Sequence, residues 1–207
     1  MLFTIDLFGT TFSHKSLRIK DDRMPVKPDQ WIIEMCQKHR MIEPFEKTQI
    51  RNGISYGVSS YGYDISLSDE FKILDTKTVE FLDPKENNDG HFKDVRAESI
   101  IIPAKSFILA RTREYFRIPR NIITICLGKS TYARNGVVVN VTPFEPEWEG
   151  FATISLSNTA SVPVKVYAHE GVAQLLFLEA DRECLQSYKD KKGKYQAQQE
   201  ITLSKSD

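Results

Sequence analysis

The sequence predicts an all-β fold with one helix near the start of the chain. Short segments rich in Ile, Val, Phe and Thr recur between residues 71 and 178, and Gly, Pro and Asn residues separate them. This pattern is typical of a β-sandwich, a jelly roll or a β-barrel. A chain of 207 residues, 41% of them hydrophobic, is long enough for one well-packed domain and short for two.

Local patterns place the individual elements. Apolar residues recur at helical spacing between residues 31 and 36, and Asp29 is a candidate N-cap, so we expect a helix over about residues 29–40. Residues 1–23 have no clear period and are expected to form a disordered N-terminal extension, followed by one domain over residues 24–207. The expected strands are 71–74, 99–102, 106–112, 122–127, 137–141, 152–156, 164–167 and 172–178.

Composition and charge exclude several classes of function. The 28 Lys and Arg residues balance the 28 Asp and Glu residues, so no overall charge attracts a nucleic acid or an anionic membrane. No run approaches the roughly 20 apolar residues of a membrane span. The three cysteines lie far apart and in no metal-binding spacing, which favours free thiols in a reducing compartment and hence a cytoplasmic location.

Residues 128–136 have a composition suited to phosphate binding. They follow an apolar predicted strand and carry two cations, Lys129 and Arg134, with the hydroxyls of Ser130 and Thr131 and glycines at both ends. Backbone N–H groups and hydroxyls can bind phosphate oxygens while the cations neutralise charge. The segment is not a Walker A loop. A surface turn with incidental cations is the alternative interpretation.

Three further segments have both a functional and an ordinary interpretation. Residues 142–150 hold three carboxylates, and Pro146 and Trp148 would stiffen this loop and partly desolvate a carboxylate, raising its pKa towards that of a general base; a solvated loop is the alternative. Residues 55–64 place glycines between aromatic side chains, which suggests close backbone approach or, equally, a tight β-turn. The tail, residues 188–207, is charged, and composition alone favours a mobile segment.

The histidine pattern excludes one kind of deaminase. His14, His39, His91 and His169 are isolated, and the sequence has no P-C-x-x-C motif. Zinc-dependent cytosine deaminases need such a His/Cys set with a nearby Glu. We therefore expect no zinc and no protein side chains that bind a metal.

Six segments taken in order resemble the dCTP deaminase family, which shares its fold with the trimeric dUTPases. The likeness extends from about residue 25 to residue 203 and rests on residues 54–64, 110–120, 126–134, 139–150, 170–174 and 193–196. The resemblance implies a distorted jelly-roll or β-barrel of the dUTPase-like type that forms a homotrimer. It also implies hydrolytic deamination of dCTP to dUTP and ammonia, which supplies dTTP biosynthesis.

The resemblance further implies a site shared between subunits. The phosphate segment would bind the triphosphate with Mg²⁺, partly from a neighbouring subunit, and the tail from residue 188 would close over the nucleotide as a lid. The ligands implied are dCTP, dUTP and dTTP. The nucleotide-binding residues implied are Lys129, Ser130, Thr131, Tyr132, Ala133, Arg134, Pro143, Thr153, Ile154, Ser155, Gln174, Tyr188, Lys194 and Gln198, and the catalytic positions are Ser155, Ser130, Thr142 and Glu145.

One position departs from the family pattern. In such deaminases a Glu on the strand after the Trp-x-Gly turn acts as the general base, and the matching residue here is Ser155. Alternation supports the match, because Thr153, Ser155 and Ser157 share one face of the predicted strand while Ile154 and Leu156 face the core. A serine hydroxyl cannot replace a carboxylate as base unless another group activates it, and no histidine is near in sequence.

We therefore expect an impaired deaminase, with two alternatives. Related dUTPases have a small residue on this strand and take their water-activating carboxylate from the preceding turn, where Glu145 lies here. Glu145 also belongs to the deaminase pattern, and the C-terminal Gly-rich motif of dUTPases is missing. A non-catalytic binder of deoxynucleoside triphosphates is the second alternative, because an intact pocket without its base would still bind.

Overall fold

A computed structural model describes residues 25–77, 79–86 and 88–205. The expected N-terminal extension, residues 1–23, lies outside the described residues. The described chain begins with helix α1 (Asp29–His39), which packs Ile32 and Cys36 into the core. The helix confirms the sequence prediction, but its N-cap is Pro28 and not Asp29. Asp29 is the first helical residue, where its carboxylate accepts a hydrogen bond from the N–H of Gln30 and favours the positive end of the helix dipole.

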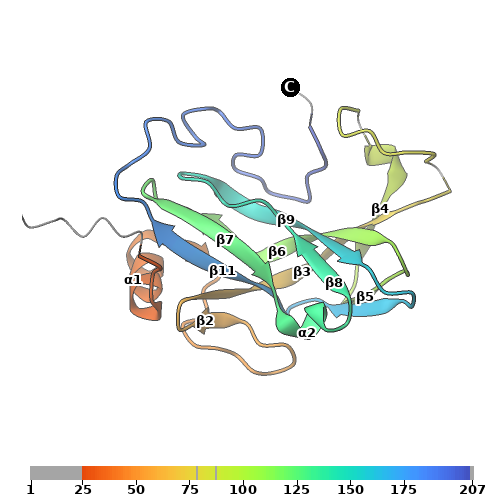
Figure 1. The fold of residues 1–207 in the computed structure, drawn as a ribbon, viewed down its shortest axis with the longest axis horizontal. Coiled ribbons are helices and arrows are strands. Elements are labelled where there is room, and N and C mark those ends of the chain that lie inside the picture. Colours follow the sequence, from red (N-terminus) through yellow and green to blue (C-terminus); the bar gives the residue numbers. More distant parts are fainter. Residues whose placement is uncertain (1–24, 78, 87, 206–207) are drawn as a thin grey trace, which may run out of the picture.

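The rest of the domain is a curved antiparallel sheet in the order β7-β11-β3-β6-β9-β8, with β1 paired to β6 and both β2 and β4 paired to β3 (Figure 1). The strands at the two ends of this order, β7 and β8, also contact each other, so the sheet nearly closes into a barrel. The strands of this sheet are β1 (Ile42–Glu43), β2 (Gly57–Ser59), β3 (Gly62–Leu74), β4 (Phe92–Arg96), β6 (Phe107–Arg117), β7 (Ile122–Gly128), β8 (Val137–Asn140), β9 (Glu149–Asn158) and β11 (Gly171–Glu179).

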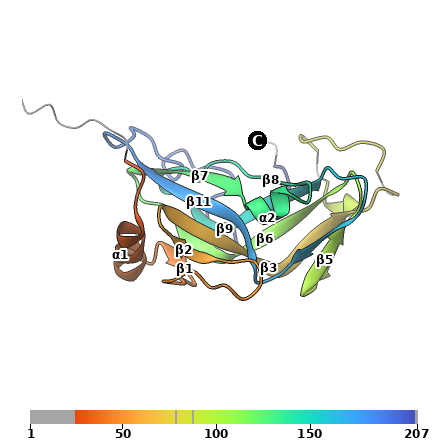
Figure 2. The ribbon, with the colours of Figure 1, turned by 60° about the horizontal axis from the view of Figure 1, so that its bottom comes forward.

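Two short strands and two short helices complete the domain. Strands β5 (Ser99–Ile102) and β10 (Val164–Tyr167) pair as a separate ribbon. The 3₁₀ helix η1 (Asp89–His91) precedes β4, and helix α2 (Ser130–Ala133) lies between β7 and β8 (Figure 2). In the described part of the chain, no helix is long and apolar enough to cross a membrane.

The core lies inside the curved sheet and confirms the predicted all-β class. Tyr63, Phe71, Phe116 and Phe177 are among its largest fully buried side chains. Alternating burial along β6 and β9 sends every second side chain into this core. That alternation fixes which side chains of β9 remain available for a site on its other face.

The predicted strands exist, and several are longer than predicted. Strands β1, β2 and β4 were not predicted. Strand β3 begins at Gly62, nine residues before the predicted strand at Phe71, because its first half is buried on both faces and shows no alternation. Residues 55–64 contain a tight β-hairpin, since Ser59 pairs with Gly62. The close approach predicted for its glycines is to the chain itself: a Cβ on Gly62 would lie 2.7 Å from the carbonyl oxygen of Leu175.

Candidate functional site

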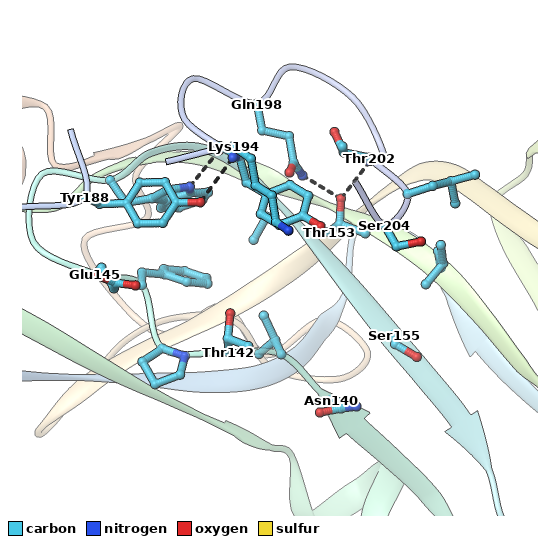
Figure 3. Close-up of a pocket in the computed structure, with 18 of the residues that line it drawn as sticks. Asn140, Thr142, Glu145, Thr153, Ser155, Tyr188, Lys194, Gln198, Thr202 and Ser204 are labelled. Atoms are coloured by element: carbon cyan, nitrogen blue, oxygen red, sulfur yellow. Dashed lines mark hydrogen bonds between the residues drawn. The ribbon is translucent and has the colours of Figure 1, made fainter. Parts of the chain in front are cut away.

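A pocket of about 640 Å³ lies between β9, the loop that joins β8 to β9, and the C-terminal segment (Figure 3). The C-terminal segment lies over the pocket and forms one of its walls (Figure 3). The pocket combines aromatic surface with a small set of hydroxyl, amide and charged groups, which suits a nucleobase and its sugar. Its lining residues are Leu109, Ile123, Asn140, Val141, Thr142, Pro143, Phe144, Glu145, Trp148, Ala152, Thr153, Ser155, Tyr188, Lys194, Tyr195, Gln198, Thr202, Leu203 and Ser204.

Strand β9 supplies the floor of the pocket. Ile154 and Leu156 are fully buried in the core, while Thr153 and Ser155 line the pocket, as the alternation predicts. The Cα partners of Ser155 are Leu109 on β6 and Asn140 on β8, and both of these residues also line the pocket. The side chain at position 155 therefore faces the space that a ligand would occupy.

The loop after β8 is held rigidly against the barrel. The N–H of Phe144 donates to Thr124 Oγ1 at 2.8 Å, and the N–H of Thr124 donates back to the Phe144 carbonyl oxygen at 3.3 Å. The ring of Phe144 lies 4.7 Å from that of Trp148, and both side chains are buried. Thr142 and Pro143 precede this clamp, so the backbone and hydroxyl groups they offer to the pocket are fixed in position.

The acidic groups of this loop are paired with cations. Glu145 Oε2 lies 2.8 Å from Lys191 Nζ of the C-terminal segment, and this pairing raises the pKa of Lys191. Glu147 accepts hydrogen bonds from Ser187 and from Arg120, and these lower its pKa although burial opposes them. The expectation that a carboxylate of this loop would have a raised pKa is therefore wrong for Glu147, because its donors outweigh its desolvation.

The C-terminal segment is attached to β9 by a series of hydrogen bonds. Thr153 Oγ1 accepts from Gln198 Nε2 at 2.5 Å and from the N–H of Thr202 at 3.0 Å. Gln198 also forms an isolated parallel β-bridge with Gly150. Gly150 has a φ of 143°, and a Cβ there would lie 2.8 Å from the backbone nitrogen of Gln198, so only glycine fits this contact.

Aromatic side chains hold the middle of the same segment. Trp148 Nε1 donates to the carbonyl oxygen of Tyr195 at 2.9 Å, and the N–H of Tyr195 donates to the Tyr188 hydroxyl at 3.1 Å. Lys194 lines the pocket, and its ammonium donates to the carbonyl oxygen of Lys205. Composition favoured a mobile tail, but contacts that composition cannot register hold residues 188–205 against the barrel.

Residues 128–136 lie away from this pocket in the chain. None of them is among the lining residues, and Figure 1 shows α2 at the end of β7 and β8 far from the C-terminal segment. Ser130, Thr131, Ala133 and Arg134 are exposed. Tyr132 is buried, with its hydroxyl accepting a hydrogen bond from the N–H of Tyr167 at 3.1 Å.

The predicted residues therefore fall into two groups within the chain. Of the predicted residues, Thr142, Pro143, Glu145, Thr153, Ser155, Tyr188, Lys194 and Gln198 line the pocket. Residues 129–134 form the second group, in and beside α2, away from the pocket. Gln174 lies outside both, donating to Ser59 Oγ at 2.8 Å, and the side chain of Ile154 points into the core.

Sequence reasoning missed several lining residues. Asn140 precedes the loop motif, and its place beside Ser155 depends on the pairing of β8 with β9. Thr202 and Ser204 come from the end of the tail, where no motif marks them. Trp148 was noted as a stiffening residue, and the structure adds that its indole N–H binds the tail.

Comparison with known proteins places this chain and its fold in one class. The model of the dCTP deaminase-like family matches residues 26–180. A crystal structure of 2′-deoxycytidine 5′-triphosphate deaminase from Agrobacterium tumefaciens is similar in fold, with a TM-score of 0.59 and 12% sequence identity. That match covers 76% of this chain and 48% of the other.

Close sequence relatives define the family more narrowly. A dCTP deaminase of Nitrosomonas europaea is 58% identical over 187 residues, which cover 88% of this chain and all of that protein. A dCTP deaminase of Pseudomonas putida is also 58% identical, over 87% of this chain and 98% of its own length. The chain belongs to the dCTP deaminase family.

Proposed function

We propose that this chain catalyses the hydrolytic deamination of dCTP to dUTP and ammonia, with a turnover reduced by Ser155, and that the product feeds dTTP biosynthesis. The observation that carries the proposal is the pocket itself: in a chain of the dCTP deaminase family, a cavity sized for a nucleoside is lined by Thr142 and Ser155 and covered by the C-terminal segment. Charge balance gives no reason to add a nucleic acid or a membrane as partner.

The reaction assigns a task to each part of the pocket. A water oxygen bonds to C4 of the base, and the bond between C4 and the exocyclic amino nitrogen breaks. One proton of the water ends on ring N3, and the other goes to the amino group, which leaves as ammonia. Thr142 and Pro143 would orient the base and the water from their clamped loop, and Ser130 of a neighbouring subunit would act beside them. The tail residues Tyr188, Lys194 and Gln198 would cover the nucleotide.

Ser155 sets the expected limit on the rate. Its hydroxyl can orient a water or the amino group by hydrogen bonding, but it cannot take up a proton at neutral pH. The lack of a placed general base usually costs about 10²–10⁴-fold in rate. Among the lining residues Glu145 is the one carboxylate that could accept a proton through a water, and it is already paired with Lys191.

A homotrimer would bring the two groups of residues together. Each pocket lacks the cations and hydroxyls of residues 128–136, which lie elsewhere on the protomer, so a neighbouring copy would supply them. Ile125, Leu127 and Val138 are 42%, 53% and 50% exposed on the two strands that flank α2, and this apolar surface suits an interface between copies. Light scattering should give a particle of about three chain masses, and a monomer would contradict the arrangement.

Magnesium would enter with the nucleotide. Among the described residues no group of three or more His, Cys, Asp or Glu side chains could hold a metal ion. Triphosphate oxygens together with water can complete the octahedral coordination that Mg²⁺ prefers, so the protein need only bind the complex. Free cysteines and a substrate drawn from the soluble nucleotide pool support a cytoplasmic location.

One set of measurements tests the proposal against its two alternatives. Calorimetric titration with dCTP and dUTP should give binding, and an ammonia-release assay should give slow turnover of dCTP without pyrophosphate. Pyrophosphate release from dUTP, abolished by Glu145→Gln, would identify a dUTPase-type enzyme. Binding with no release of either product would identify a non-catalytic nucleotide binder.

A further inference from the structure

Lys129, the first cation of residues 128–136, is already paired within its own protomer. Its Nζ lies 2.6 Å from Asp64 Oδ2 and donates to Ser55 Oγ at 3.2 Å. The Lys129 side chain is 13% exposed and that of Asp64 is 5% exposed. The pair is therefore largely shielded from water. In such surroundings the attraction between the two charges is strong, and separating them is costly.

Asp64 is held in place from several sides. It lies on β3, where its Cα partners are Gly57 on β2 and Gln174 on β11. Gln49 Nε2 donates a further hydrogen bond to Asp64 Oδ2 at 3.1 Å. The carboxylate is thus fixed in the sheet and does not turn to follow a lysine that moves away.

The stem of Lys129 is also enclosed. A Cβ on Gly171 would lie 1.9 Å from the carbonyl oxygen of Ser55 and 3.1 Å from Cδ of Lys129. The lysine side chain therefore packs where the backbone of Gly171 closely approaches that of Ser55. The N–H of Lys129 donates to the carbonyl oxygen of Val172 at 3.0 Å. These contacts attach the start of α2 to β11 and to the loop before β2.

Arg134 has the opposite surroundings. It is exposed, and its Nη1 donates a hydrogen bond to the carbonyl oxygen of Ser130 at 3.1 Å. Within the described ranges it forms no ion pair with a carboxylate. An exposed guanidinium that is held by its own helix and has further N–H donors available is suited to bidentate binding of a phosphate.

We propose that Asp64 is a positioning residue: it neutralises Lys129 and anchors the start of the phosphate segment, so that Arg134 supplies the positive charge that the segment offers to a triphosphate. This inference rests on the proposed function, in which residues 128–136 bind phosphate. The pair has no net charge, so the attraction of Lys129 for a phosphate is largely offset by the repulsion from Asp64. If Lys129 turned to the phosphate, it would leave a nearly buried carboxylate without its cation.

The substitution Asp64→Asn tests the inference because it keeps the shape and removes the charge. It should leave one uncompensated positive charge beside the phosphates and tighten dCTP binding by about three- to tenfold, the scale of one added charge at partial screening. Titration calorimetry at two salt concentrations should show a steeper salt dependence than in the unmodified protein. Binding of dCMP, which carries fewer phosphate charges, should change less, and a purely structural role would not alter this dCTP-to-dCMP ratio.

Two further variants separate the outcomes. Arg134→Met should weaken dCTP binding at least tenfold, and the double variant Asp64→Asn/Lys129→Met should bind dCTP less tightly than Asp64→Asn alone and retain far more affinity than Arg134→Met. Thermal melting of each variant shows that it is folded. If Asp64→Asn does not fold, the double variant, which leaves no buried charge, decides the question on its own.

The inference is overturned if folded Asp64→Asn binds dCTP more weakly, because Asp64 would then aim Lys129 at the phosphate. A loss in the double variant as large as that of Arg134→Met would have the same meaning. If Arg134→Met leaves dCTP affinity unchanged, the assignment of the whole segment to phosphate fails, and the proposed site fails with it. The two kinds of failure are therefore distinguishable.

Discussion

The substitution Ser155→Glu places a carboxylate at the one pocket position where deamination needs a base. The Ser155 side chain faces the pocket from β9, between Asn140 and Leu109 on the neighbouring strands, and the 640 Å³ of space above it has room for the longer side chain. We expect ammonia release from dCTP to rise by at least about two orders of magnitude, the usual contribution of a placed general base. A hundredfold rise corresponds to a barrier lower by about 2.7 kcal/mol.

The assay is ammonia release under saturating dCTP, with dCTP affinity measured separately. Ser157→Glu is the matched control, because Ser157 lies on the same face of β9 but does not line the pocket. Ser155→Gln adds the same length without a base, and neither control should raise the rate. The reasoning is refuted if the unmodified protein already turns over dCTP at an ordinary enzymatic rate, or if Ser155→Glu binds dCTP and releases ammonia no faster.

Four other outcomes follow from the structure. Arg134→Ala should weaken binding of dCTP by roughly 1.5–3 kcal/mol, the range for a charge-assisted hydrogen bond, and unchanged affinity in calorimetry would remove the segment from the site. Deletion of residues 1–23 should leave the melting temperature and dCTP binding intact, whereas a fall of several degrees would show that they pack on the barrel. Thr153→Val removes the acceptor for Gln198 and Thr202, which should lower the free energy of tail opening by roughly 1–3 kcal/mol. The amide hydrogen of Thr202 should then exchange with solvent faster. An unchanged exchange rate would mean that other contacts hold the tail. Burial raises the pKa of Glu114 from 4.5 to about 7, so the folded chain binds more protons than the unfolded chain between these values. Stability should therefore fall as pH rises through that window. Glu114→Gln should flatten this pH dependence in melting curves, and an equal slope would assign the dependence to another group.

The strands that could be predicted are those with an alternating pattern or a clear boundary. The predicted strands at residues 99–102 and 164–167 agree with β5 and β10 to the residue, and a proline bounds each on one side, since Pro103 follows the first and Pro163 precedes the second. The first half of β3 was missed because a strand buried on both faces has no period. Strand β1 has two residues and exists only through its pairing with β6.

The candidate site was predictable where it follows local patterns. Alternation along β9 correctly gave the faces of Thr153 and Ser155 from the sequence alone. The pairing of Lys129 with Asp64 joins residues 65 positions apart in the chain and has no local signature. Asn140 enters the pocket through the register of two strands, which propensity does not specify.

The hydrogen bond between the Trp148 indole and the Tyr195 carbonyl makes the intrinsic fluorescence of Trp148 a signal for attachment of the C-terminal segment. The sequence contains two tryptophans, and the other, Trp31, lies in α1 with its ring 6.0 Å from that of Phe177, remote from the pocket. When the C-terminal segment detaches, the indole of Trp148 loses its acceptor and meets water, so its emission should shift to longer wavelength while that of Trp31 stays constant. The rate at which the pocket uncovers, and therefore the rate at which a product could leave, can be timed in the unlabelled protein.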